Sequence, residues 1–156
     1  MSQRSVIVGM NNPISMRPEH ALYPHPAGCA GWRLWKMLNE ESGASKHEYL
    51  DAFERVNVLT GKWIKAEAHR SAVELQRAYT GRTILLLGRD VQQAFDAPKD
   101  LSPLDCYRHH ASLVPRFTTT FYLVPHPSGR NTWYNAEGNR RMVAALLGRL
   151  YREHKR

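Results

Sequence analysis

The stretch TILLLG, Thr83–Gly88, decides the fold. Its four consecutive apolar residues do not alternate with polar ones, as they would in a strand with one face in water. A short apolar run that ends in glycine predicts a strand buried on both faces, and such strands are typical of parallel sheets covered by helices. SVIVG, Ser5–Gly9, has the same character.

The pattern on either side of this strand extends the prediction. Two more strands are expected, at Phe53–Leu59 and Phe117–Val124. Helices are expected at about Gly31–Asn39, Lys62–Tyr79, Val91–Phe95 and Ala136–Arg152. Because strands and helices alternate, we expect a parallel sheet with helices on both faces. The predicted fold is a three-layer α/β/α sandwich around four parallel strands, formed as a single domain by residues 1–156.

The composition limits the class of protein. The chain has 156 residues, of which 42% are hydrophobic and 23% charged, as in ordinary globular domains. No apolar run approaches the roughly 20 residues that span a bilayer, and the apolar run near the start of the sequence is too short for a secretory signal. We therefore expect a cytoplasmic monomer that does not contact membranes. The two cysteines, Cys29 and Cys106, exclude a disulfide framework and a four-cysteine metal site.

The charge balance favours a polyanionic partner. Lysine and arginine total 22 against 14 acidic residues, which gives a net charge of +8. The alternative is a basic surface with no specific partner. The sequence has no GxxxxGK[ST] loop, no GxSxG turn and no histidines at metal-ligand spacing, so P-loop nucleotide binding, serine hydrolysis and metal binding are not expected.

Unusual polar residues follow the predicted strands. In parallel sheets, ligands bind beyond the carboxyl ends of the strands. Asn11 and Asn12 come after the first strand, and they either hold a water or ligand or form an ordinary turn. Asn57 interrupts an apolar strand, and a buried amide without a partner costs about 1–3 kcal/mol. Asn57 therefore either bonds a neighbouring backbone group or reads a ligand.

The last strand runs into PHPSGRN, Pro125–Asn131. Prolines on both sides of His126 restrict the backbone, and a stiff loop suits a group that meets a ligand without reorganising. Ser128, Gly129 and Arg130 offer a hydroxyl, backbone amides and a guanidinium, which are the groups that bind phosphate. A histidine that fills a gap and a plain turn are the alternatives.

A long loop, Asn11–Ala30, is also expected near this edge of the sheet. Loops of this length are uncommon unless they are functional. Tyr23 in the loop either stacks on a planar ligand or covers the core.

Two of these segments resemble motifs of the uracil-DNA glycosylase superfamily. VGMNNP, Val8–Pro13, resembles the first motif, GMNPG in the single-strand-selective monofunctional branch and GINPG in the mismatch-specific branch. HPSGRN, His126–Asn131, resembles the second motif, HPSPRN or NPSG in the same branches. ILLLGRDVQQAF is similar to the block between the two motifs. Alignment of the first motif on Gly9 selects Asn11 as the water-orienting residue, whereas alignment on Pro13 selects Asn12.

The resemblance implies a uracil-DNA glycosylase-like fold and a monofunctional DNA N-glycosylase. Such an enzyme flips uracil, or a related modified or mismatched pyrimidine, out of DNA and hydrolyses its N-glycosidic bond during base-excision repair, without metal or cofactor. His126 would stabilise the departing base and Asn11 would orient the water. The implied base-binding residues are Met10, Asn12, Tyr23 and Asn57, and the implied DNA-binding residues are Ser128, Gly129, Arg130 and Asn131.

Two other functions remain open on the residues alone. One is a non-catalytic DNA-binding module of the same fold that recognises a modified base. The other is an enzyme that acts on small nucleosides or nucleotides in the same crevice, although the net charge of +8 favours DNA.

Overall fold

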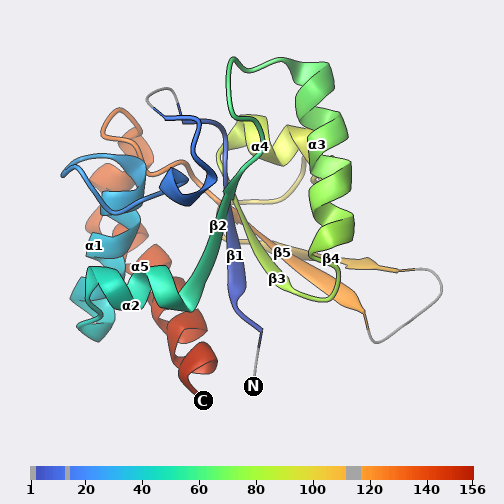
Figure 1. The fold of residues 1–156 in the computed structure, drawn as a ribbon. Coiled ribbons are helices and arrows are strands. Elements are labelled where there is room, and N and C mark those ends of the chain that lie inside the picture. Colours follow the sequence, from blue (N-terminus) through green and yellow to red (C-terminus); the bar gives the residue numbers. More distant parts are fainter. Residues whose placement is uncertain (1–2, 13–14, 112–116) are drawn as a thin grey trace.

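The computed structural model describes residues 3–12, 15–111 and 117–156. They form a five-stranded sheet in the order β2-β1-β3-β5-β4 (Figure 1). The strands are β1 (Ser5–Gly9), β2 (Phe53–Asn57), β3 (Thr83–Leu87), β4 (Cys106–His110) and β5 (Thr118–Val124). β2, β1, β3 and β5 are parallel, and β4 runs antiparallel to β5.

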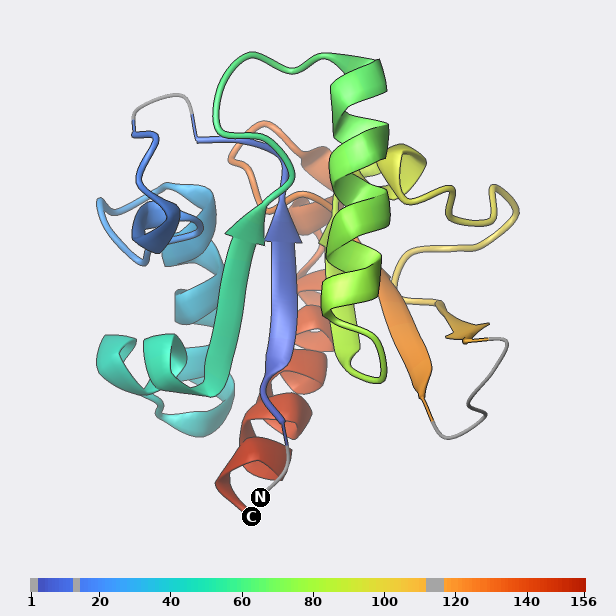
Figure 2. The same cartoon turned by 45° about the vertical axis from the view of Figure 1, so that its right-hand side comes forward.

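Helices cover both faces of this sheet (Figures 1 and 2). The α-helices are α1 (Ala30–Ser42), α2 (Lys46–Ala52), α3 (Lys65–Ala78), α4 (Arg89–Ala94) and α5 (Glu137–Lys155). Two short 3-10 helices lie at Pro18–His20 and Thr132–Asn135. α1, α2 and α5 pack on one face, and α3 and α4 pack on the other. The prediction of an α/β fold with helices on both faces of a sheet is confirmed, and the four predicted strands are parallel. The antiparallel strand β4 was not predicted.

β3 explains why the apolar run is continuous. Ile84 and Leu86 belong to the core under α3 and α4, whereas Leu85 and Leu87 belong to the core under α1 and α5. Successive side chains of a strand point to opposite faces, so a central strand needs apolar residues at every position. All four side chains are at most 1% exposed.

The prediction of four strands is wrong by one. The fifth strand, β4, has the sequence CYRHH and lies at the edge of the sheet, where most of its residues are exposed. It therefore lacks the apolar pattern that marks a strand. Tyr107 anchors it, because its ring stacks on Phe121 of β5 with 4.8 Å between ring centroids.

The predicted order of elements also lacked α2. Its start carries a capping box, in which Ser45 accepts a hydrogen bond from the backbone of Glu48 and Glu48 accepts one from the backbone of Ser45. The S-x-x-E pattern was present in the sequence, but the helix has only seven residues. It lies between α1 and β2 and buries Tyr49 completely.

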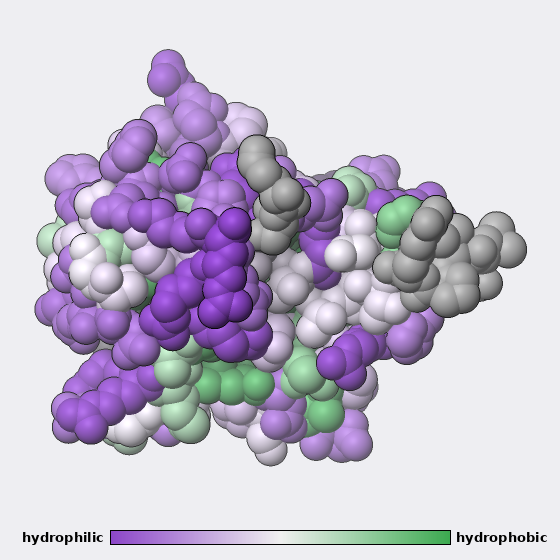
Figure 3. Space-filling model, turned by 90° about the horizontal axis from the view of Figure 1, so that it is seen from below, coloured by the Kyte–Doolittle hydropathy of each residue, from purple (hydrophilic) through white to green (hydrophobic). Residues whose placement is uncertain are grey.

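The carboxyl ends of the parallel strands point to the upper edge of the sheet in Figure 2, away from both chain termini. Figure 3 views the molecule from below, on the side of the two chain termini, and that surface is mainly hydrophilic with small apolar patches. Among the described residues, no helix combines the length and the apolar character needed to cross a membrane.

The long loop before α1 is fixed on this helix by a close approach of backbone. A Cβ atom at Gly31 would overlap the carbonyl oxygens of Leu22 and Tyr23. The buried hydroxyl of Tyr49 also donates a hydrogen bond to the carbonyl oxygen of Leu22 at 2.9 Å. The loop is thus held at the carboxyl edge of the sheet by its backbone.

Substitution Gly31→Ala tests this contact. We expect it to lower the free energy of unfolding by about 2 kcal/mol, because the added methyl group has to displace backbone. Gly138→Ala in α5 is the matched control, since nothing lies within 4 Å of a Cβ atom there, and alanine favours a helix over glycine. Urea unfolding followed by circular dichroism measures both. Equal losses in the two variants would contradict the interpretation.

Candidate active site at the carboxyl edge of the sheet

Four parallel strands bring the predicted polar residues to one edge. Asn57 at the end of β2 pairs in register with Gly9 at the end of β1. Gly88 follows β3, and its amide donates a hydrogen bond to the carbonyl oxygen of Val124, two residues before His126. Because neighbouring strands are about 4.8 Å apart, the ends of β1 and β5 lie roughly 10 Å apart with β3 between them.

The Asn57 side chain lies over Gly9. Its Oδ1 is 2.6 Å from the position that a Cβ atom of Gly9 would occupy, and the Leu22 methyl groups are 3.3 and 3.4 Å from the same position. Asn57 is half-buried, and its amide makes no hydrogen bond to any residue that the structure describes. The sequence left two roles open for Asn57: a hydrogen bond to neighbouring backbone, or recognition of a ligand. No described backbone group makes the first bond, so the amide is available to a ligand.

The two asparagines after β1 differ in their partners. Nδ2 of Asn11 donates to the carbonyl oxygen of Gly61 at 2.9 Å, and no described residue donates to its Oδ1. Nδ2 of Asn12 donates to the carbonyl oxygen of His20 at 3.3 Å, and its Oδ1 accepts from the amide of Ser15 at 3.2 Å. Asn12 thus closes the loop, whereas Asn11 keeps one acceptor for a ligand. Pro13 and Ile14 lie outside the described residues.

The backbone around His126 is held by several hydrogen bonds. Its carbonyl oxygen accepts from the amide of Ser128 at 2.9 Å and from Nδ2 of Asn131 at 3.0 Å. The hydroxyl of Tyr134 donates to the carbonyl oxygen of Pro125 at 2.6 Å. These bonds add to the restriction that the two prolines impose, so the imidazole has a fixed base.

Gly88 permits the loop after β5 to approach β3. Its φ angle is +86°, which favours glycine, and a Cβ atom there would lie 3.1 Å from the Cβ of His126. Any larger residue at this position would push His126 away from the end of β3.

The His126 ring itself has no internal partner. It is half-buried, and neither ring nitrogen forms a hydrogen bond to a described residue. Desolvation by the surrounding protein lowers the pKa of His126 below the ordinary value of 6.5. The imidazole is therefore neutral at pH 7, with one N–H free to donate to a ligand.

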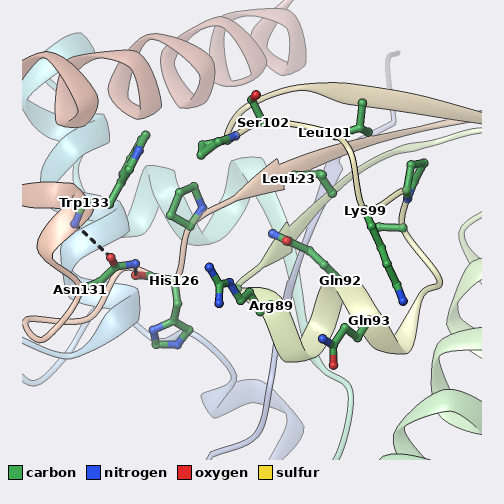
Figure 4. A pocket seen from close by; sticks show the side chains of 15 residues that line it. Arg89, Gln92, Gln93, Lys99, Leu101, Ser102, Leu123, His126, Asn131 and Trp133 are labelled. Atoms are coloured by element: carbon green, nitrogen blue, oxygen red, sulfur yellow. Dashed lines mark hydrogen bonds between the residues drawn. The ribbon is translucent and has the colours of Figure 1, made fainter.

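The remaining residues of the second motif have separate roles. Asn131 is occupied inside the loop, since its Oδ1 also accepts from the amide of Trp133 at 3.1 Å (Figure 4). Gly129 and Arg130 are exposed. Arg33, from α1, lies beside them: its Nη2 is 2.8 Å from the position of a Gly129 Cβ, and its Nε donates to the carbonyl oxygen of Gly28. Arg33 carries no local signal in the sequence, because only the fold brings it to this loop.

Tyr23 and Met10 lie at the margins of the site. The Tyr23 side chain is 41% exposed and packs near the His20 ring, with 6.0 Å between ring centroids. Its neighbour Leu22, rather than Tyr23, covers Gly9. Met10 is half-buried against the core under α3 and α4.

A cavity of about 700 Å³ opens beside His126, between α4, the end of β5 and the segment 97–103 (Figure 4). Its lining includes His126 and Asn131 but not Asn11, Asn57 or Tyr23. The structure therefore places the amide side chains and the imidazole at one edge without joining them in one cavity. A second cavity, of about 670 Å³, lies between α3 and α4 and is bordered by Asp90 and Asp96.

Within the described residues, no group of three or more His, Cys, Asp or Glu side chains is placed to hold a metal ion.

No protein-family model matches the chain, and no curated protein matches it. The relationship to uracil-DNA glycosylases therefore stays a prediction from two short motifs.

The lowered pKa of His126 predicts how stability depends on pH. A histidine whose pKa is lower in the folded state binds fewer protons than in the unfolded state, so the free energy of unfolding falls as the pH drops below about 6.5. The variant His126→Gln removes this contribution and should flatten the pH dependence in that range. Unfolding at pH 5 to 8, with an NMR titration of the His126 ring, measures both effects. A ring that titrates above 6.5 would contradict the prediction.

Proposed function

We propose that this chain is a metal-independent, monofunctional DNA N-glycosylase that hydrolyses the N-glycosidic bond of a flipped uracil or related pyrimidine. The observation that carries the proposal is the His126 imidazole: it is half-buried, neutral at pH 7, fixed at its backbone and without an internal partner. A preorganised N–H of this kind suits an oxygen on which negative charge develops. The O2 atom of a pyrimidine is such an oxygen when the base departs as an anion.

The reaction needs little from the protein besides positioning. The bond between C1′ of the sugar and N1 of the base breaks, and its electron pair stays on the base. Water then adds to C1′ and loses its proton to solvent. His126 donates a hydrogen bond to O2 throughout and transfers no proton. The unpartnered Oδ1 of Asn11 accepts a hydrogen bond from the water and holds it, because an amide is too weak a base to deprotonate it.

Asn57 supplies the recognition of the base in this proposal. Uracil presents an N3–H donor beside the O4 acceptor, and an amide offers the complementary acceptor and donor. The Asn57 amide is half-buried and has no described partner that competes with a base. A base without a matching edge leaves this amide unpaired, which is how a buried polar group rejects the wrong ligand.

DNA is the partner that the charge distribution favours. The net charge is +8, and Arg33 and Arg130 lie at the rim formed by the second motif. Backbone amides and the Ser128 hydroxyl add phosphate-binding groups there. A uracil-DNA glycosylase-like arrangement of the sheet and a monomeric, intracellular protein are parts of the same proposal.

One observation favours the alternative of a non-catalytic DNA-binding module. Asn11 and Asn57 do not line the cavity beside His126. Without closure around DNA, the edge would bind a modified base by its amides and leave the glycosidic bond intact. Such a module would bind DNA with a steep dependence on salt and release no base.

An assay of base release separates the two functions. Oligonucleotides with uracil, hydroxymethyluracil or mismatched thymine are incubated with the protein, and free base is measured by mass. We expect His126→Ala to lower the rate of release by about 100-fold or more, in the range of a lost oxyanion donor. Asn57→Ala should lower it at least about tenfold, because a buried recognition bond is lost. Asn135→Ala is the control, since Asn135 is exposed in the 3-10 helix Thr132–Asn135. No free base from any of the three substrates would contradict the enzymatic function.

The two asparagines after β1 are distinguished by a second pair of variants. Asn11→Ala should reduce base release strongly and stability by about 1 kcal/mol, the value of one exposed hydrogen bond. Asn12→Ala should mainly reduce the free energy of unfolding, because it loses the bonds that close the loop. An Asn12→Ala protein of unchanged stability but without activity would assign the water to Asn12 instead.

A further inference from the structure

The cavity beside His126 has a composition that suits a nucleotide. Its side chains include two cations, Arg89 and Lys99, and the indole of Trp133, and no aspartate or glutamate lines it. Its volume of about 700 Å³ lies within the range of small-molecule sites. Figure 4 shows Trp133 and Lys99 on opposite sides of the cavity, with Arg89 and Gln92 between them.

We propose that this cavity binds the nucleotide next to the target nucleotide in a single DNA strand, with the base of this neighbour out of the stack. Arg89 and Lys99 bind its phosphate, and Trp133 stacks on its base. The proposal rests on the proposed function in one respect, namely that His126 faces the target base.

The two cations are free to bind phosphate. Arg89 is the first residue of α4, directly after the Gly88 turn, and Lys99 lies in the following loop; both are exposed. Neither forms an ion pair within the described residues. By contrast, Arg141 and Lys155 on α5 are paired with Glu137 and Glu48. Phosphate binding at this cavity therefore breaks no existing ion pair.

The Trp133 side chain is held in a fixed orientation at the border of the cavity. Its ring packs edge-on against Tyr134, with 4.9 Å between centroids and an angle of 86° between the planes. Its amide is held by Asn131, the residue that also holds His126. An aromatic fixed in this way stacks on a base with little loss of side-chain entropy, and stacking of this kind tolerates any base.

A single strand is the occupant that the geometry favours. The base of a nucleotide in a duplex is paired and stacked, so it enters a cavity only after its base pair is broken. A nucleotide in a single strand has no base pair to break, so the free-energy cost of moving its base out of the stack is smaller. The cavity borders His126, so a strand with its target base at His126 continues along this rim. The second cavity is a poorer choice, because Asp90 and Asp96 line it together with Lys65 and Lys99 and offset their positive charge.

Binding of an oligonucleotide without uracil tests the cavity independently of catalysis. The affinity of labelled oligothymidine is measured by fluorescence anisotropy for wild type, the double variant Arg89→Ala/Lys99→Ala, Trp133→Ala and Trp133→Phe. We expect the double variant to bind at least about tenfold more weakly, with a salt slope smaller by about 0.7, which corresponds to one phosphate contact on a single strand. Trp133→Ala should bind at least about fivefold more weakly, and Trp133→Phe should recover most of the loss.

The controls separate the cavity from general electrostatics and from folding. Arg77→Ala removes one exposed positive charge from the last turn of α3, and we expect it to change the affinity less than twofold. Arg89 and Lys99 are exposed, so their variants keep the test valid if Trp133→Ala is unstable. A duplex of the same length should bind more weakly than the single strand. Equal binding of the duplex through the same residues would overturn the proposal, as would equally tight binding of thymidine monophosphate.

Base release from a uracil oligonucleotide, measured on the same variants, distinguishes this proposal from the proposed function. If base is released and neither the affinity nor KM depends on Arg89, Lys99 and Trp133, the cavity proposal is wrong and the glycosylase stands. If no base is released but the variants weaken binding of the single strand, the glycosylase is wrong and the cavity stands.

Discussion

The rest of the structure depends on the burial of β3 from both sides. Its four apolar side chains divide between two cores, one under α1 and α5 and the other under α3 and α4. A strand with no solvent-facing side needs a helix layer on each face of the sheet and a neighbouring strand on each side. β1 and β5 are these neighbours, and both pair with β3 in parallel. Parallel pairing is what collects all four carboxyl ends on one side. The packing of the core therefore determines that the polar residues after these strands lie at one edge of the sheet.

The end of β3 also sets the spacing of the candidate site. Gly88 turns with a positive φ angle, and a Cβ atom there would press on the Cβ of His126 at 3.1 Å. The loop after β5 consequently lies close to the central strand, while the asparagines after β1 lie on its other side. A ligand that contacts both groups has to lie across the end of β3. Gly88 adds no side chain at that end, and Arg89 and Gln92 follow it at the border of the cavity.

Sequence patterns predicted what depends on neighbours along the chain. Apolar runs located the four parallel strands, and their ends located Asn57 and His126 at one edge. β4 was missed because an exposed edge strand carries no apolar pattern, and it exists through its pairing with β5. Contacts between segments far apart in the sequence could not be predicted either. Arg33 lies against Gly129, and Leu22 rather than Tyr23 lies over Gly9. These contacts follow from helix placement and from loop backbone, which no local motif encodes.

The carboxyl edge holds side-chain polar groups that have no hydrogen-bond partner among the described residues. Asn57 and His126 are half-buried, so water reaches their polar groups, and leaving them unpartnered costs less free energy than it would for a fully buried group. Leu22, beside Asn57, adopts a φ angle of +50°, which is unfavourable for a leucine. These features lie where parallel sheets bind ligands. A ligand that pairs these groups breaks no hydrogen bond within the described residues, which is a physical reason to place the function at this edge.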